Sequence, residues 1–296
     1  MKPPPFPEGP SGDGRVPGAA VLGWPVAHSL SPLLHGFWLR RMRLPGRYDA
    51  LPVPPDALAA TLRRLPGEGF RGVNLTLPHK EAAFALCDRP DAAARRTGGL
   101  NTLVFGSDGA ISGLNSDCPG FRDALLASGK ITPAATRRGA AVVLGAGGAA
   151  RAVAVALEEL GYAPVWLVNR GQARAERAAE ELGGVARAAA LTRLPALLEE
   201  AAILVNATSL GMTGQPPLDL ALDPLPRAAL VADIVYVPLH TPLLRRAMAR
   251  GNPVMDGLDM LMHQAVPGFT AWFDPPAPPR VTAELRRTLL HALGEG

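Results

Sequence analysis

The lysines of this chain are few enough to single one out as a candidate for chemistry. Of the thirty lysine and arginine residues only three are lysines, namely Lys2, Lys80 and Lys130. A lysine side chain can give up its proton, whereas an arginine side chain cannot. Lys80 ends the run Asn74-Leu75-Thr76-Leu77-Pro78-His79-Lys80, in which amide, hydroxyl and imidazole groups precede it. The alternative, that Lys80 only begins a solvated helix, has to be weighed against the motifs around it.

Other polar side chains in the first part of the chain stand where strands or turns are expected to end. Together they supply hydroxyl, amide, ammonium and carboxylate groups, the set needed to bind a small polyhydroxylated acid. Each one alone could do no more than cap a helix or complete a turn. The residues are Ser29, Ser31, Thr76, Lys80, Asn101, Asn115 and Asp117.

A glycine-rich motif in the middle of the chain predicts a dinucleotide site. The apolar stretch 141–144 runs into Gly145-Ala146-Gly147-Gly148-Ala149-Ala150-Arg151, and a helical pattern continues to Leu160. Backbone N–H groups at the start of such a helix can bind a pyrophosphate, and the glycines permit its close approach. The strand before the motif and the helix after it make the signal specific. We expect Gly145, Ala146, Gly147, Gly148 and Ala149 to bind the cofactor.

The end of the next strand indicates which dinucleotide is bound. An NAD site has a carboxylate about 20 residues further on, which binds the ribose 2′-hydroxyl. This chain has Asn169 and Arg170 there, and Arg174 one helical turn later. Guanidinium groups bind a 2′-phosphate through charge-assisted hydrogen bonds. The sequence therefore predicts NADP as the cofactor, held in part by Asn169, Arg170 and Arg174.

The elements that position the first set of residues mix parallel and antiparallel signals. Residues 19–23 read as a buried strand, after which Ser31 caps a helix that has Pro32 at its first position and runs to about Arg43. A second strand is predicted over 72–77, followed by a helix over 80–86. Two short strands flank Ser107-Asp108-Gly109 as a hairpin.

A regular alternation of strand and helix begins after Lys130. Strands are predicted over 141–144, 165–168, 203–205 and 230–235, with helical segments between them. This order is typical of a parallel sheet with crossover helices. Two further helices, over 258–268 and 282–293, are expected to pack on the first domain.

These patterns predict an α/β protein with two domains. A Rossmann-type NADP-binding domain is expected over residues 118–257. An α/β substrate domain is expected over residues 19–117 and is completed by C-terminal helices in residues 258–296. Residues 1–18, which are rich in proline, are expected to be a disordered extension.

Composition restricts the class of protein further. The 296 residues suit two domains, and 48% hydrophobic residues can supply two cores. No apolar run approaches a membrane span, and the two cysteines have no CxxC spacing, so we expect a cytoplasmic protein without a zinc or other metal site. The net charge of +4 comes with scattered arginines rather than a basic stripe, which argues against nucleic acid as a partner.

Eight motifs, spread in a consistent order over residues 19–270, resemble the shikimate dehydrogenase family. The first four are the segment from Gly23 to His35, the segment from Asn74 to Lys80, Asn101-Thr102-Leu103, and Asn115-Ser116-Asp117. The other four are the segments from Gly145 to Arg151, Asn206 to Met212, Asp233 to Pro242, and Asp256 to Gln264.

The resemblance implies NADPH-dependent reduction of 3-dehydroshikimate to shikimate, with Lys80 and Asp117 handling the proton. It implies that Ser29 and Ser31 bind the substrate carboxylate, with Tyr236 nearby, and that the ring hydroxyls contact Thr76, Asn101, Asp117 and Gln264. On the cofactor side it adds Ile234 and Gly257 to the glycine-rich motif and to Asn169, Arg170 and Arg174. It also implies that the active site lies in the cleft between the two domains. The protein is expected to be a monomer or a homodimer.

Some positions depart from the family pattern, and three alternatives stay open. Leu114 and Cys118-Pro119 surround the Asn115-Ser116-Asp117 motif where the family commonly has aspartate and glycine, and Gly171 replaces a frequent threonine. A relative that oxidises quinate, or both acids, is the nearest alternative. The others are a non-catalytic protein that binds NADP or a metabolite, and a similar dehydrogenase for a folate or an amino acid.

Overall fold

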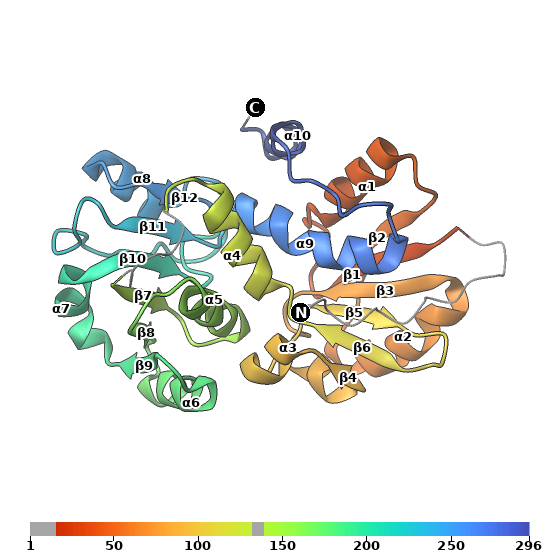
Figure 1. The fold of residues 1–296 in the computed structure, drawn as a ribbon, viewed down its shortest axis with the longest axis horizontal. Helices are drawn as coiled ribbons and strands as arrows, with labels where there is room; N and C mark the ends of the chain where they lie inside the picture. Colours follow the sequence, from red (N-terminus) through yellow and green to blue (C-terminus); the bar gives the residue numbers. More distant parts are fainter. Residues whose placement is uncertain (1–15, 132–138, 296) are drawn as a thin grey trace. The chain divides into compact units, whose positions relative to one another are not determined.

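The chain folds into two compact units in a computed structural model that describes residues 16–131 and 139–295 (Figure 1). The first unit comprises the chain up to Ser116 together with Gln264–Gly294, and the second comprises Asp117–His263. The division therefore falls inside one long helix, whereas the sequence placed the return to the first domain at residue 258. Of the proline-rich extension, residues 1–15 lie outside the described part, and Gly18 already belongs to the first strand.

The first unit is built on a mixed sheet with the strand order β2-β1-β3-β5-β6-β4 in its described residues. Strands β1, β2 and β3 run parallel, with β2 at one end of the described order, and β5 runs antiparallel to both β3 and β6. In sequence order the strands are β1 (Gly18–Gly23), β2 (Arg47–Pro52), β3 (Phe70–Leu75), β4 (Arg89–Pro90), β5 (Thr102–Phe105) and β6 (Ile111–Leu114).

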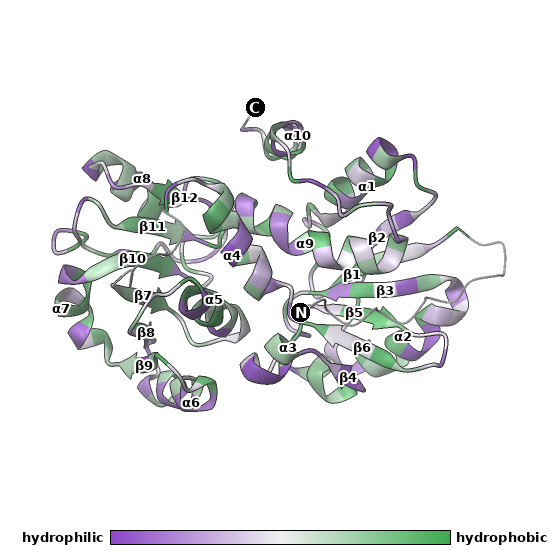
Figure 2. Cartoon of the chain, viewed as in Figure 1, coloured by the Kyte–Doolittle hydropathy of each residue, from purple (hydrophilic) through white to green (hydrophobic). Residues whose placement is uncertain are grey.

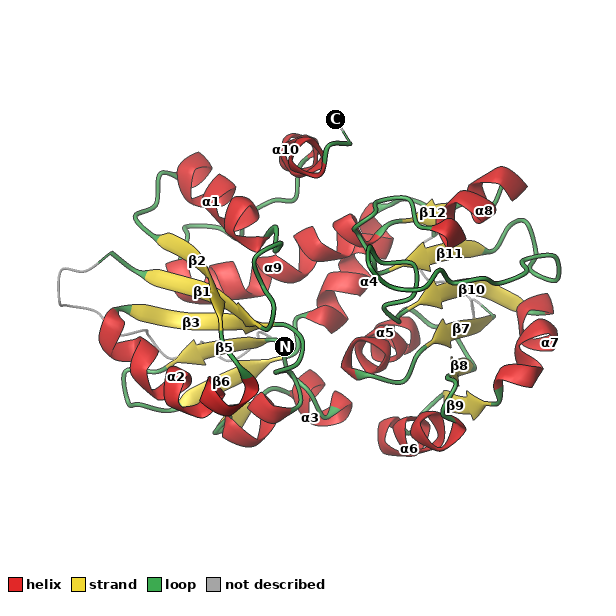
Figure 3. Ribbon diagram, turned by 180° about the vertical axis from the view of Figure 1, so that it is seen from behind, coloured by secondary structure: helices red, strands yellow, loops and turns green. Residues whose placement is uncertain are grey.

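Side chains on a strand alternate between its two faces, so this sheet presents side chains on both sides. Helices cover both of these faces. On one face Leu22 and Val73 pack in a buried cluster with Leu58 and Leu62 of helix α2 (Leu58–Arg64). The other face carries α1 (Ser31–Met42) and the C-terminal part of α9 (Gly257–Phe273) (Figure 3). The remaining helices of the unit are α3 (Ala92–Thr97) and α10 (Ala283–Leu293).

A glycine in β3 makes room for the closest contact between α9 and the sheet. The indole Nε1 of Trp272 donates to the carbonyl oxygen of Leu103 at 2.9 Å. A Cβ atom on Gly72 would lie 2.1 Å from that same indole nitrogen. Gly72 is therefore required by packing, and its backbone φ needs no glycine.

The second unit is an all-parallel sheet with the described strand order β12-β11-β10-β7-β8-β9. Its strands are β7 (Ala140–Leu144), β8 (Val165–Val168), β9 (Ala186–Ala189), β10 (Ala201–Asn206), β11 (Leu230–Asp233) and β12 (Val254–Met255). Its helices, besides the start of α9, are α4 (Asp117–Ala127), α5 (Gly148–Glu159), α6 (Gln172–Leu182), α7 (Leu194–Glu199) and α8 (Pro242–Arg250).

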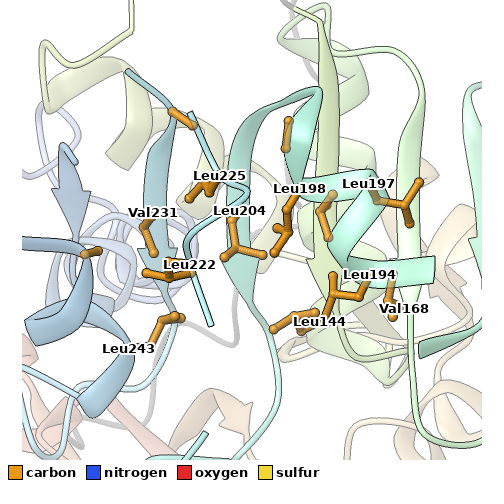
Figure 4. Packing of buried hydrophobic residues seen from close by; sticks show 14 of the residues in the cluster. Leu144, Val168, Leu194, Leu197, Leu198, Leu204, Leu222, Leu225, Val231 and Leu243 are labelled. Atoms are coloured by element: carbon orange, nitrogen blue, oxygen red, sulfur yellow. The ribbon is translucent and has the colours of Figure 1, made fainter. Parts of the chain in front are cut away.

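Leucine-rich packing fixes one face of this parallel sheet. Leu144 and Leu204 of the strands contact Leu194 and Leu198 of α7 and Leu243 of α8 in a single buried cluster (Figure 4). The strands are mostly hydrophobic, with polar residues such as Asn206 and Asp233 at strand ends, whereas the helices carry both apolar and polar residues (Figure 2). This is the pattern expected when helices cover both faces of a parallel sheet.

Several local predictions are corrected by the structure. Ser31 is the first helical residue of α1, and the N-cap is Leu30, with no side-chain cap. The strand predicted over 72–77 ends at Leu75, and the helix predicted over 80–86 is a short 3₁₀ helix, Ala82–Leu86. The strand predicted to end at residue 235 ends at Asp233, and α9 continues to Phe273 despite Pro267.

Candidate active site

The predicted substrate residues of the first unit converge on one edge of its sheet. Ser29 and Ser31 follow the carboxyl end of β1, and Thr76 and Lys80 follow the carboxyl end of β3. Asn101 precedes β5, which runs in the opposite direction, so it lies at the same edge. The amide of Leu75 donates to the carbonyl oxygen of Asn101 at 2.8 Å, which joins these two segments directly.

The two serines are coupled to each other. The backbone N–H of Ser31 donates to Oγ of Ser29 at 3.3 Å. Ser29 is partly exposed, whereas Ser31 is buried at the start of α1. Since the Ser29 oxygen accepts from the helix start, its hydroxyl hydrogen is directed to another acceptor.

The segment that carries Lys80 is held in place by its neighbours. The N–H of Thr76 donates to the carbonyl oxygen of Leu22 at 2.9 Å. The imidazole of His79 is buried, and its Nε2 lies 2.8 Å from the carbonyl oxygen of Val53. Lys80 itself is partly exposed, as a group that meets a substrate must be.

Asn101 and Gln264 are joined by a buried polar network. Nδ2 of Asn101 donates to Oε1 of Gln264 at 3.2 Å, and the amide of Ser116 donates to Oδ1 of Asn101 at 2.7 Å. Because Oδ1 accepts from Ser116, the orientation of the Asn101 carboxamide is fixed. Gln264, predicted only through the family resemblance, is thus placed beside Asn101 by α9.

The remaining predicted substrate residues belong to the second unit. Asp117 is buried at the first turn of α4, directly after Ser116. Tyr236 follows β11, and burial raises the pKa of its phenol. These two residues therefore belong to a different unit from Lys80.

The glycine-rich motif of the second unit has the geometry of a dinucleotide turn. It leaves the carboxyl end of β7 with Gly145 at φ +116°, a conformation that L side chains rarely adopt. Gly147 then forms the N-cap of α5 without a side-chain cap, so backbone N–H groups at this helix start are not satisfied by a capping side chain. A Cβ on Gly148 would meet nothing within 4 Å, which leaves space for a phosphate.

Two arginines lie next to this turn. Arg170 and Arg174 are exposed, and Nη2 of Arg174 lies 3.7 Å from the position that a Cβ on Gly147 would take. Asn169 donates from Nδ2 to the carbonyl oxygen of Gly171 at 3.1 Å, which shapes the loop after β8. The absence of an acidic side chain between β8 and α6 suits a 2′-phosphate rather than a free 2′-hydroxyl. The residues present therefore fit NADP.

Ile234 and Gly257 are brought together after β11 and β12. A Cβ on Gly257 would lie 2.4 Å from the carbonyl oxygen of Ile234, so only glycine allows this approach. The loop after β11 is anchored by Asp233, which accepts from Asn206 Nδ2 at 2.9 Å and from Thr241 Oγ1 at 2.7 Å. Burial raises the Asp233 pKa to about 6, although these hydrogen bonds oppose the shift.

Sequence reasoning missed the residues that support the site. Asn206 and Asp233 lay inside quoted motifs, but their role as loop anchors depends on the adjacency of β10 and β11. Tyr48 and Asn74, joined by a hydrogen bond of 2.6 Å, come from two strands that have β1 between them. Buried polar residues near strand ends were the available signal, and β2 had not been predicted at all.

Two negative findings hold for the described residues. None of their His, Cys, Asp and Glu side chains form a group of three or more that could hold a metal ion. None of the helices in residues 16–131 and 139–295 is long and apolar enough to cross a membrane.

Most of the predicted substrate residues lie in the first unit, and the glycine-rich turn lies in the second. A parallel sheet with a glycine-rich turn and adjacent arginines, in a chain that also has a separate polar substrate domain, defines an NADP-dependent dehydrogenase of small molecules. Family models agree with this class: residues 21–103 match the substrate binding domain of shikimate dehydrogenase, and residues 126–212 match shikimate/quinate 5-dehydrogenase. The chain belongs to the shikimate dehydrogenase family.

Individual relatives cover nearly the whole chain. The NADP(+) shikimate dehydrogenase of Methylobacterium radiotolerans is 56% identical over 92% of this chain and 95% of its own length. The shikimate dehydrogenase of Thermus thermophilus, solved with NADP(H) and shikimate, has a TM-score of 0.82 and 41% identity over 93% of this chain and 99% of its own. A quinate dehydrogenase of Corynebacterium glutamicum, solved with NAD, has a TM-score of 0.83 at 26% identity over 93% of this chain and 99% of its own.

Proposed function

We propose that this chain catalyses the reversible NADPH-dependent reduction of 3-dehydroshikimate to shikimate, with Lys80 and Asp117 as the proton-handling pair. The observation that carries the proposal is the convergence of Ser29, Thr76, Lys80 and Asn101 at one sheet edge. The family and its NADP-dependent activity supply the rest of the argument.

The substrate carboxylate is assigned to Ser29 and Ser31. The Ser29 oxygen accepts the Ser31 N–H, so its O–H is suited to donate to a carboxylate. Thr76, Asn101 and Gln264 are assigned to the ring hydroxyls, and Tyr236 to the neighbourhood of the carboxylate. A pterin has no carboxylated polyol for these hydroxyl groups to bind, which argues against a folate substrate.

The proton is assigned to Lys80. Bound NADPH supplies a hydride and no proton. As the ketone oxygen gains negative charge, the Lys80 ammonium stabilises that charge and then donates its proton, and it takes the proton back when shikimate is oxidised. Asp117 orients the ammonium group and binds the adjacent hydroxyl of the substrate.

The cofactor is assigned to residues of the second unit. Gly145, Ala146, Gly147, Gly148 and Ala149 would hold the pyrophosphate through backbone N–H groups at the start of α5. The 2′-phosphate of the cofactor would be held by Asn169, Arg170 and Arg174. The nicotinamide end of the cofactor would lie near Ile234 and Gly257. The active protein is proposed to be a cytoplasmic monomer or homodimer.

Steady-state oxidation of shikimate and of quinate, each with NADP and with NAD, tests the proposed function. We expect kcat/KM for shikimate with NADP to exceed every other combination by at least about tenfold, since a missing phosphate contact costs about 1.4 kcal/mol or more. A preference for quinate with NAD would identify a quinate dehydrogenase instead. The absence of turnover with all four combinations would favour a non-catalytic binding protein.

A further inference from the structure

A chain of hydrogen bonds within the first unit links two of the proposed substrate residues to buried polar side chains of the sheet. It runs from β2 through β3 and β5 to α9, and two of its members, Asn101 and Gln264, are proposed above to contact the substrate. Four others have no assigned role. The members in spatial order are Tyr48, Asn74, Thr102, Asn101, Ser116 and Gln264.

The direction of the bonds around Tyr48 follows from the donors of Asn74. Nδ2 of Asn74 donates to the carbonyl oxygen of Asn101 at 3.2 Å and to Oγ1 of Thr102 at 2.9 Å. Its Oδ1 must therefore accept, and it does so from Oη of Tyr48 at 2.6 Å. The only hydroxyl hydrogen of Tyr48 is therefore used in this bond.

The ring of Tyr48 packs against other buried aromatic rings. It stacks on the imidazole of His35, with ring centroids 4.0 Å apart and an interplanar angle of 3°. Trp272 of α9 lies on the same cluster, 6.0 Å from the Tyr48 ring centroid. Burial raises the Tyr48 pKa well above its ordinary value, so the hydroxyl keeps its proton and remains a donor.

The far end of the network fixes two amide groups. Oγ1 of Thr102 lies 3.1 Å from Oγ of Ser116, and the amide of Ser116 donates to Oδ1 of Asn101. Because Oδ1 of Asn101 accepts this bond, its Nδ2 faces Gln264 and donates to Oε1 of that residue. The network therefore decides which atoms Asn101 and Gln264 can present to a ligand.

We propose that Tyr48 is a positioning residue for the substrate, acting by way of Asn74 and Thr102 on Asn101. It contacts no substrate atom itself, and it helps to set the orientation of a side chain that does. This inference rests on the proposed function, because it takes Asn101 as a substrate contact. A tyrosine that served only the core would need no buried hydrogen bond to a polar side chain of another strand.

Tyr48→Phe tests the proposal, since it keeps the ring stacked on His35 and removes only the hydroxyl. In shikimate oxidation with NADP we expect KM for shikimate to rise about tenfold, while KM for NADP stays the same and kcat falls by less than about threefold. The matched control is Tyr162→Phe, the same change at a buried tyrosine of the second unit, which should alter neither KM. A wild-type enzyme that is inactive in this assay would refute the proposed function rather than this inference.

A double-mutant cycle separates positioning from general stability. In a Thr102→Val background, Tyr48→Phe should raise KM for shikimate by no more than about threefold, because part of its effect passes through Thr102. If the two changes multiply independently, or if Tyr48→Phe lowers the melting temperature and leaves KM for shikimate unchanged, the proposal is overturned. Should Tyr48→Phe not fold, Thr102→Val interrupts the same network, and an unchanged KM for shikimate in that variant contradicts the proposal equally.

Discussion

At the scale of single residues, burial decides the protonation of groups near the proposed site. His35 is fully buried among aromatic rings, and neither of its ring nitrogens has a hydrogen-bond partner within ordinary distance. Burial accordingly lowers the His35 pKa from 6.5 to about 3. His35 therefore stays neutral at any pH where the enzyme would work, which rules it out as a general acid.

The lowered pKa of His35 predicts a loss of stability in mild acid. Between about 3 and 6.5 the unfolded chain binds a proton at His35 that the folded chain does not, so stability falls as pH falls through this range. Lowering the pH from about 7.5 to about 5 should reduce the free energy of unfolding by roughly 2 kcal/mol through His35 alone. Urea unfolding of wild type and His35→Phe at both pH values measures it.

The comparison between the two proteins isolates His35 from other titrating groups. Asp233, whose raised pKa acts in the opposite direction, is present in both and cancels in the difference. Any packing cost of the phenylalanine is likewise common to both pH values. If the free energy of unfolding falls by the same amount in wild type and in His35→Phe between these pH values, His35 is not neutral and buried as described.

At the scale of elements, the direction of the strands gathers the functional residues at sheet edges. In the second unit the glycine turn, Asn169, Ile234 and Gly257 all follow carboxyl ends of parallel strands, where ligands bind in such sheets. In the first unit β5 is antiparallel, so Asn101 reaches the corresponding edge from the start of its strand rather than from its end.

Sequence patterns predicted the elements with strong periodicity and missed those that depend on context. Val165–Val168 was predicted with the bounds that the structure gives, because four apolar residues rich in valine form a buried strand. Ala186–Ala189 was not predicted, since alanine has little preference for strands and this one forms only by pairing with β8.

The approach of α9 to the loop after β11 predicts a strong effect of one added methyl group. Gly257→Ala would bring a Cβ within 2.4 Å of the Ile234 carbonyl oxygen, so the backbone must move. We expect a loss of about 1–3 kcal/mol in unfolding free energy, as for other overpacked sites, and a higher KM for NADP. Gly67→Ala is the control, because a Cβ there meets nothing within 4 Å; equal stability of the two variants would contradict the packing argument.

At the scale of the whole molecule, the proposed reaction needs both units. The first holds Lys80 and the serines, and the second holds Asp117 and the dinucleotide turn. From the motifs we predicted separate domains for the glycine-rich turn and for the substrate contacts, with Asp117 on the substrate side, because each set of residues is local in sequence. The buried network through Tyr48 and Asn74 could not be predicted, since it depends on the order of strands in the sheet.

The central claim, that Lys80 handles the proton in NADP-dependent shikimate oxidation, is tested most directly by Lys80→Ala. We expect kcat to fall by at least about a hundredfold, the usual contribution of a positioned general acid, while the Kd for shikimate and for NADP change by less than about threefold. Lys130→Ala, at the other lysine within the described residues, is the matched control and should turn over at the wild-type rate. A Lys80→Ala enzyme with wild-type kcat would contradict the account.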